Sequence, residues 1–231
     1  MIILASVFFI FILKLAFQIK IKNLRKIKEI GYDKSLNAIT NKLPDNKAVC
    51  EEILHQLGNN TVSIEESEDK NNTLTYYSIM TNHIIIANIK DTFTRIQTIA
   101  HECIHSVQDR KTLLFNFIFS NIYLLYFGII CILTIFKVIK FPVLQIVILI
   151  LLSGIYYAIR SYLETDAMTK APYVAKQYIE QSGMLSKEEI EVIMRNYESL
   201  NKIGISMTNF GLMITTIIKI VIYCVIAMIV M

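Results

Sequence analysis

The pentapeptide His101-Glu102-Cys103-Ile104-His105 carries the most specific chemical pattern in this chain. On a helix, His101 and His105 lie one turn apart on the same face, so two imidazoles at this spacing can hold one Zn²⁺. Glu102 then lies beside them and can take a proton from a metal-bound water. The chain has only four histidines, which makes this arrangement a specific signal. The pattern predicts the helix of a zinc hydrolase.

The residues around the pentapeptide follow helical spacing on two faces. The apolar stripe consists of Phe93, Ile96, Ala100, Ile104 and Val107. The polar stripe beside it consists of Gln97, His101, His105 and Gln108. We expect this helix to be capped by Asp91 or Thr92 and to run to about Arg110.

The segment before this helix combines one helix with β-type sequence. Residues 43–57 have helical periodicity, with Asp45 as a candidate N-cap and Gly58 as a stop signal. Residues 61–64 predict a strand, and an acidic turn is expected at residues 65–72. Residues 74–80 and 83–87 predict a hairpin that turns at Thr81-Asn82. These strands predict a small antiparallel sheet.

The composition indicates a membrane protein. The chain has 231 residues and is 54% hydrophobic, which is too apolar for an ordinary soluble domain. Four runs are candidate membrane spans: residues 2–18, 113–136, 141–159 and 210–230. The second and third form a hairpin, with Pro142 at the start of its second arm. The expected fold is an α-helical membrane protein with a small α+β, zincin-like cytoplasmic portion.

Charge predicts the orientation of the chain. The net charge is +4, and a basic cluster directly follows the first run: Lys20, Lys22, Arg25, Lys26 and Lys28. By the positive-inside rule, residues after about 19 are cytoplasmic, so the site faces the cytoplasm. Membrane topology accounts for this cluster, and no nucleic-acid partner is expected. The four cysteines are scattered and form no disulfide framework, in keeping with a reducing compartment.

The chain is expected to have five segments. Residues 1–19 form an anchor, and residues 20–111 form the cytoplasmic helix, sheet and motif helix. Residues 112–160 form the membrane hairpin, residues 161–208 a cytoplasmic helical segment, and residues 209–231 the final span. Within the fourth segment, Ser186 to Glu189 is a capping box and Gly183 ends the preceding helix. Lys219 in the final span is expected to face the bundle interior or to snorkel, because no span contains an acidic residue.

A catalytic zinc site needs a third protein ligand. The metzincin extension is excluded, because Gln108 and Lys111 occupy the positions of its glycine and third histidine. His55 and His83 lie upstream and are expected to be ordinary surface or packed residues. Glu164 follows the third span on the same membrane side as the motif, where it is either the third ligand or an interfacial charge.

The chain resembles a known family at several places. Ile99-Ala100-His101-Glu102-x-x-His105-Ser106-Val107-Gln108, a membrane hairpin and Glu164-Thr165-Asp166-Ala167 follow the pattern of the bacterial membrane-bound neutral zinc metallopeptidases of the YugP-like family, over roughly residues 45–185. The resemblance implies a gluzincin-type site in a bacterial cell membrane, with His101, His105 and Glu164 as ligands and Glu102 as general base. This chain departs from the family at Ile104, where a glycine is usual, and matches it only loosely after residue 187.

Two neighbouring acids are candidates for orienting the ligands. Asp109, four residues after His105, is either such a group or a surface acid, and Asp166 lies two residues after Glu164 rather than the four typical of soluble gluzincins.

Two other functions compete with a metallopeptidase that acts on peptides or membrane proteins close to the bilayer. An intramembrane protease carries the motif inside a span, but polar residues flank the motif here: Arg95, Gln97, Gln108, Asp109, Arg110 and Lys111. A non-catalytic membrane scaffold holds a structural metal or none. Glu102 argues against the scaffold, because a structural site has no use for an unligated carboxylate.

Overall fold

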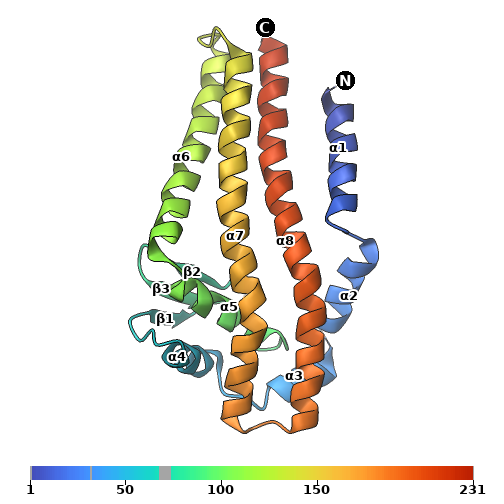
Figure 1. The fold of residues 1–231 in the computed structure, drawn as a ribbon, viewed down its shortest axis with the longest axis vertical. Coiled ribbons are helices and arrows are strands. Elements are labelled where there is room, and N and C mark those ends of the chain that lie inside the picture. The colour runs from blue at the N-terminus through green and yellow to red at the C-terminus, as the bar shows by residue number, and fades with distance from the viewer. Residues whose placement is uncertain (1, 32, 68–73, 231) are drawn as a thin grey trace. The chain divides into compact units, whose positions relative to one another are not determined.

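The computed structural model describes residues 2–31, 33–67 and 74–230, and it is mostly helical with one small sheet (Figure 1). The elements in chain order are α1 (Ile2–Ala16), α2 (Ile21–Gly31), α3 (Lys34–Thr40), α4 (Asn46–Gln56), β1 (Ser63–Glu66), β2 (Tyr76–Ser78), β3 (His83–Ile86), α5 (Arg95–Val107), α6 (Arg110–Ile135), α7 (Pro142–Ser182) and α8 (Lys187–Val230).

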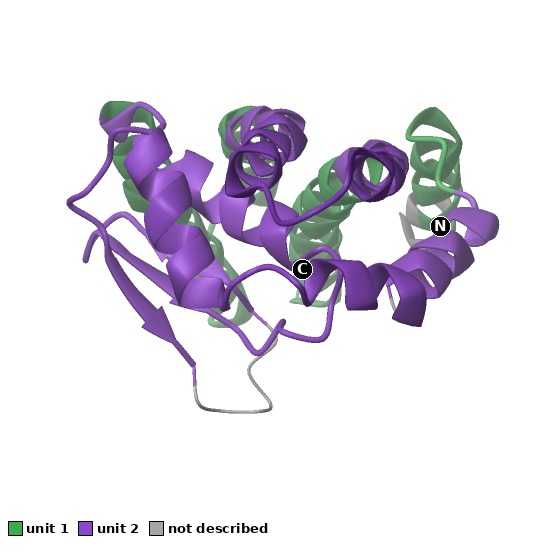
Figure 2. Ribbon diagram, turned by 90° about the horizontal axis from the view of Figure 1, so that it is seen from below, with its two compact units in different colours: residues 1–19, 111–162, 206–231 green, residues 20–110, 163–205 purple. Residues whose placement is uncertain are grey.

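The chain divides into two compact units (Figure 2). Unit 1 comprises residues 1–19, 111–162 and 206–231, and unit 2 comprises residues 20–110 and 163–205. Helices α7 and α8 each contribute residues to both units without a break. The expected fourth segment, residues 161–208, is mostly helical, and both of its boundaries fall within continuous helices.

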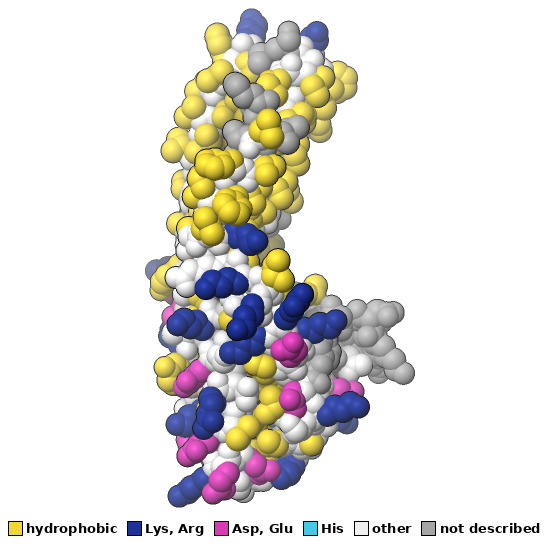
Figure 3. All heavy atoms as spheres, turned by 90° about the vertical axis from the view of Figure 1, so that its right-hand side faces the viewer, with side chains coloured by type: hydrophobic (Ala, Val, Ile, Leu, Met, Phe, Trp, Pro, Cys, Tyr) yellow, Lys and Arg dark blue, Asp and Glu magenta, His cyan; other side chains and the backbone are white. Residues whose placement is uncertain are grey.

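Unit 1 has the properties of a helical membrane domain. Helices α6, α7 and α8 are each long and apolar enough to cross a membrane. The space-filling view shows the apolar side chains that cover much of the surface of this unit (Figure 3). The expected first span is the 15-residue helix α1, which is shorter than the roughly 20 residues of a typical span. The fourth span therefore stays a prediction.

Lys219 lies on α8 and faces the interior of unit 1, which is one of the two arrangements expected for it. Its Nζ is 4.4 Å from the ring centre of Tyr123 on α6 and 5.4 Å from that of Tyr156 on α7. The electron-rich faces of the two rings attract the ammonium group. Tyr123 is itself fixed by a 2.8 Å hydrogen bond between its hydroxyl and that of Ser153.

Unit 2 is built around α5. Ile96, Ile99, Ala100, Cys103 and Ile104 of this helix are buried in one core with residues of α4, β3, α7 and α8. Helix α4 has the expected bounds: the Asp45 carboxylate accepts a hydrogen bond from the Ala48 N–H, and Gly58 follows the helix with a φ of +73°. The described contacts therefore hold the motif helix on several sides.

The sheet is mixed rather than antiparallel, which corrects the prediction. Its strand order is β1-β3-β2, with β3 antiparallel to β2 and parallel to β1. The hairpin across Thr81-Asn82 is confirmed, whereas β1 covers Ser63–Glu66 instead of 61–64 and so includes the first residues of the expected turn. Residues 68–73 of that turn lie outside the described residues. Strand β1 pairs with the edge of β3 that faces away from β2. The direction of β1 therefore depends on a pairing between residues distant in sequence and not on the hairpin turn.

The motif helix is shorter at both ends than expected. Its N-cap is Thr94 rather than Asp91 or Thr92, and the Thr92 hydroxyl donates to the Ile89 carbonyl instead. The helix ends at Val107, because Gln108 is extended and α6 starts at Arg110. Phe93 of the expected stripe precedes the helix, and Val107 is 42% exposed.

The turn between α7 and α8 is as the sequence predicts. Gly183 has a φ of +63°, and the Ser186 hydroxyl accepts from the Glu189 N–H while the Glu189 carboxylate accepts from the Ser186 N–H. This reciprocal pair is a capping box.

Candidate metal centre

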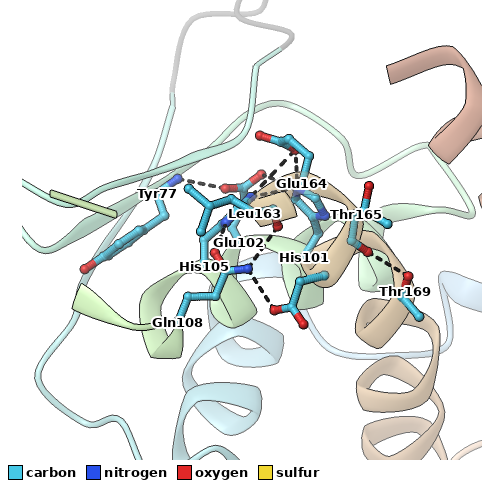
Figure 4. Close-up of polar contacts among 10 residues, drawn as sticks. Tyr77, His101, Glu102, His105, Gln108, Leu163, Glu164, Thr165 and Thr169 are labelled. Atoms are coloured by element: carbon cyan, nitrogen blue, oxygen red, sulfur yellow. Dashed lines mark hydrogen bonds and ion pairs between the residues drawn. The ribbon is translucent and has the colours of Figure 1, made fainter. Parts of the chain in front are cut away.

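Two elements of unit 2 bring three potential ligands together (Figure 4). His101 and His105 lie one turn apart on α5, with their Nε2 atoms 3.1 Å apart. Oε2 of Glu164, on α7, is 3.4 Å from Nε2 of His101 and 3.8 Å from Nε2 of His105. The ligand atoms of the three residues all lie within 4.8 Å of one another. This group can hold a metal ion.

Glu102 lies beside this group and is held by the sheet. It is 7% exposed, and its Oε2 accepts a 2.8 Å hydrogen bond from the backbone N–H of Tyr77 in β2. Its Oε1 is 3.9 Å from Nε2 of His101. Burial raises the pKa of Glu102, and the neighbouring charges of His101 and His105 partly oppose this rise. A carboxylate with a raised pKa and a fixed orientation is suited to accepting and returning a proton.

Gln108 fixes the orientation of one imidazole. Its Nε2 donates to the carbonyl of Leu163 and to Oδ2 of Asp166, both at 2.9 Å. Those two oxygens only accept, so the Gln108 side chain must turn its own oxygen toward Nδ1 of His105, 2.8 Å away. Nδ1 of a neutral His105 therefore carries the proton, and the lone pair of its Nε2 faces His101 and Glu164.

Electrostatics also shape the imidazole of His105. Burial by itself lowers the pKa of His105, but the hydrogen bond to Glu164 and the charges of Glu102 and Glu164 outweigh it, so the pKa is raised. A surplus of negative charge around the ring is what a cation at this position would neutralise. The donor set of two nitrogens and one carboxylate oxygen therefore suits a divalent metal ion.

The remaining sequence candidates lie elsewhere or act indirectly. His55 is exposed on α4. His83 on β3 contacts the Ser63 hydroxyl at 2.7 Å and the Glu65 carboxylate at 3.4 Å, and it is not part of the three-residue group. Asp109 is exposed beyond the end of α5.

Asp166 lies next to the ligands through Gln108, since it accepts the Gln108 amide and pairs with Lys170 at 2.7 Å. Burial tends to raise the pKa of Asp166, but these contacts outweigh burial and lower it.

Two contributors were missed from the sequence. Gln108 was given no role in orienting a ligand, although its position three residues after His105 was a signal that it reaches that ring. Tyr77 acts through its backbone N–H, so no side-chain pattern marked it. No protein-family model, curated protein or solved structure matches this chain.

Proposed function

We propose that this protein is a membrane-bound zinc metallopeptidase of the gluzincin type, similar to the YugP-like family. The observation that carries the proposal is the position of Glu102, an unligated and buried carboxylate beside a group of two histidines and a glutamate. A purely structural metal site needs no such carboxylate. A peptidase needs one to activate water.

The spacing of the three ligand atoms is compatible with zinc. In a tetrahedral zinc site with bonds of about 2.0–2.1 Å, neighbouring ligand atoms lie about 3.3–3.4 Å apart. The observed separations are 3.1, 3.4 and 3.8 Å. Three ligands leave the fourth position open, as in catalytic sites.

The residues of the chain then have separate roles. His101, His105 and Glu164 would hold Zn²⁺, which would supply a Lewis acid and lower the pKa of a bound water. Glu102, oriented by the Tyr77 N–H, takes a proton from the attacking water and passes it to the leaving amine. Gln108 holds His105 in the tautomer that leaves Nε2 free to bind.

The substrates follow from the anchoring of the chain. With the basic residues after α1 on the cytoplasmic side, the site faces the cytoplasm of a bacterial cell. Peptides and membrane proteins near the bilayer surface are then the accessible substrates.

The test compares zinc content and casein cleavage in detergent-purified wild type, Glu102→Gln and Glu164→Ala. Glu102→Gln keeps the acceptor for the Tyr77 N–H, so it should retain one zinc per chain and lose cleavage. Glu164→Ala should lose both. Glu180→Gln is the matched control on α7, because Glu180 is 53% exposed and pairs only loosely with Lys176.

Three results would refute the proposal. Zinc in Glu164→Ala equal to wild type would remove Glu164 as a ligand. Undiminished cleavage by Glu102→Gln would remove Glu102 as the base. Full metal occupancy without cleavage in any sample would favour the non-catalytic scaffold.

A further inference from the structure

Helix α2 has one apolar stripe, and only the C-terminal part of this stripe is packed against the protein. Ile27 and Ile30 contact the core of unit 2. Ile21 is 63% exposed and Leu24 is 44% exposed. At 100° per residue, successive members of the series Ile21, Leu24, Ile27 and Ile30 lie about 60° apart around the helix, so the exposed pair and the packed pair belong to one stripe. The packing of unit 2 does not explain why the side chains of Ile21 and Leu24 are exposed.

Cations surround this exposed apolar face. Arg25 and Lys28 lie within about 60° of Ile21 on the helix, and Lys20 and Lys22 flank the same end. All four are exposed, and no ion pair of theirs is found among the described residues. A fifth cation, Lys26, is engaged by the hydroxyl of Ser199 on α8. Figure 3, which views the side of the molecule that carries α2, shows Lys and Arg side chains gathered there.

We propose that α2 binds anionic phospholipid at the membrane surface. Ile21 and Leu24 enter the boundary between headgroups and acyl chains, while Lys20, Lys22, Arg25 and Lys28 pair with headgroup phosphates and carboxylates. A helix with a basic face and a small apolar face lies in this interface plane. The site is separate from the metal centre and does not depend on the proposed peptidase activity.

Chain connectivity and composition favour lipid over nucleic acid. Helix α2 starts at Ile21, and the apolar helix α1 ends at Ala16. The linker between Ala16 and Ile21 spans at most about 18 Å. Helix α2 therefore lies close to the membrane in which α1 is expected to be inserted. Helix α1 exposes large apolar side chains, including Phe8 at 65% and Leu15 at 63%. Helix α2 has no aromatic residue to stack on bases.

The chain contains no tryptophan, so a single tryptophan placed on α2 reports its surroundings alone. Full-length Leu24→Trp is reconstituted in vesicles of brominated phosphatidylcholine, with or without about 30% brominated phosphatidylglycerol. Bromine on the acyl chains quenches a tryptophan that enters the interface. We expect at least about twofold stronger quenching in the anionic vesicles, and a return toward the zwitterionic value in high salt.

Two matched variants separate charge from mere proximity. Leu24→Trp combined with Lys22→Gln, Arg25→Gln and Lys28→Gln should lose the dependence on anionic lipid, since these exposed side chains carry no packing role. Met184→Trp, at an exposed site between α7 and α8, should quench equally in both vesicle types.

Equal quenching of Leu24→Trp in the two lipids overturns the proposal. The proposal is also overturned if a single-stranded oligonucleotide relieves the quenching of the tryptophan at low salt while anionic lipid does not change that quenching. Nucleic acid would then be the ligand of α2.

Discussion

Replacing Gln108 with alanine tests the proposed metal centre without touching a ligand. The substitution removes the acceptor from Nδ1 of His105 and the two donor contacts to α7. His105 is then free to take the other tautomer, with its proton on the nitrogen that faces the metal position. Loss of such a supporting contact weakens metal binding by about 10–100-fold, which is about 1.4–2.7 kcal/mol.

The assay is competition for zinc between the purified protein and a chromophoric chelator. Gln97→Ala is the matched control: Gln97 is a half-buried glutamine at the other end of α5, and its contact is a 3.3 Å hydrogen bond to Asn201. Zinc affinity should fall for Gln108→Ala and stay at the wild-type value for Gln97→Ala. Circular dichroism should show both variants folded.

Either of two results would contradict this role of Gln108. Unchanged zinc affinity in Gln108→Ala would mean that His105 is oriented without this amide. An equal loss in both variants would mean that any disturbance of α5 weakens the site. The specific role of Gln108 would then be excluded.

Two further predictions concern the frame of unit 2. Arg95 is 2% exposed and donates four hydrogen bonds to the segment of residues 40–46, so Arg95→Met should lower the free energy of unfolding by about 3 kcal/mol, measured by urea titration in detergent. The pKa of Glu189 is lowered by hydrogen bonds from the Lys42 ammonium and the Ser186 N–H. Its stabilising contribution is therefore complete above the ordinary value of 4.5 and is lost as the pH falls through the lowered pKa, whereas Glu189→Gln should remove that part of the pH dependence of stability.

Features set by local chemistry were predictable from the sequence. Asp45 marks the start of α4 and Gly58 follows its end. A capping carboxylate and a residue that tolerates positive φ affect only the neighbouring residues, so both could be recognised in the sequence. The approach of His101 to His105 follows from helical spacing in the same way. From the sequence alone, Glu164 was either the third ligand or an interfacial charge. The structure places it beside the two histidines.

Features that depend on distant contacts were not predictable. The direction of β1 is set by its pairing with β3, which lies about 20 residues later in sequence. Arg95, the first residue of the motif helix, donates to the carbonyls of Leu43 and Pro44, about 50 residues earlier in the sequence. Both features are tertiary contacts that no short window of sequence contains.

The separation between the motif and its third candidate ligand has a structural cause. Unit 2 is formed from two chain segments, residues 20–110 and 163–205, with the whole of residues 111–162 in unit 1. Closing a flexible loop of that length would cost about 3.5 kcal/mol. The inserted residues are instead two helices joined by a short turn and held by contacts such as the 2.7 Å hydrogen bond from Tyr126 to Gln145.

Such a helical hairpin returns the chain near its starting point, as the contact between Gln108 and the Leu163 carbonyl shows. The spacing from His105 to Glu164 is therefore set by the length of an apolar hairpin and not by the chemistry of the site. A search for a third ligand at the short, fixed spacing of soluble metallopeptidases would pass over Glu164. Glu164 is found instead at the end of the hairpin, where the chain returns to the motif helix.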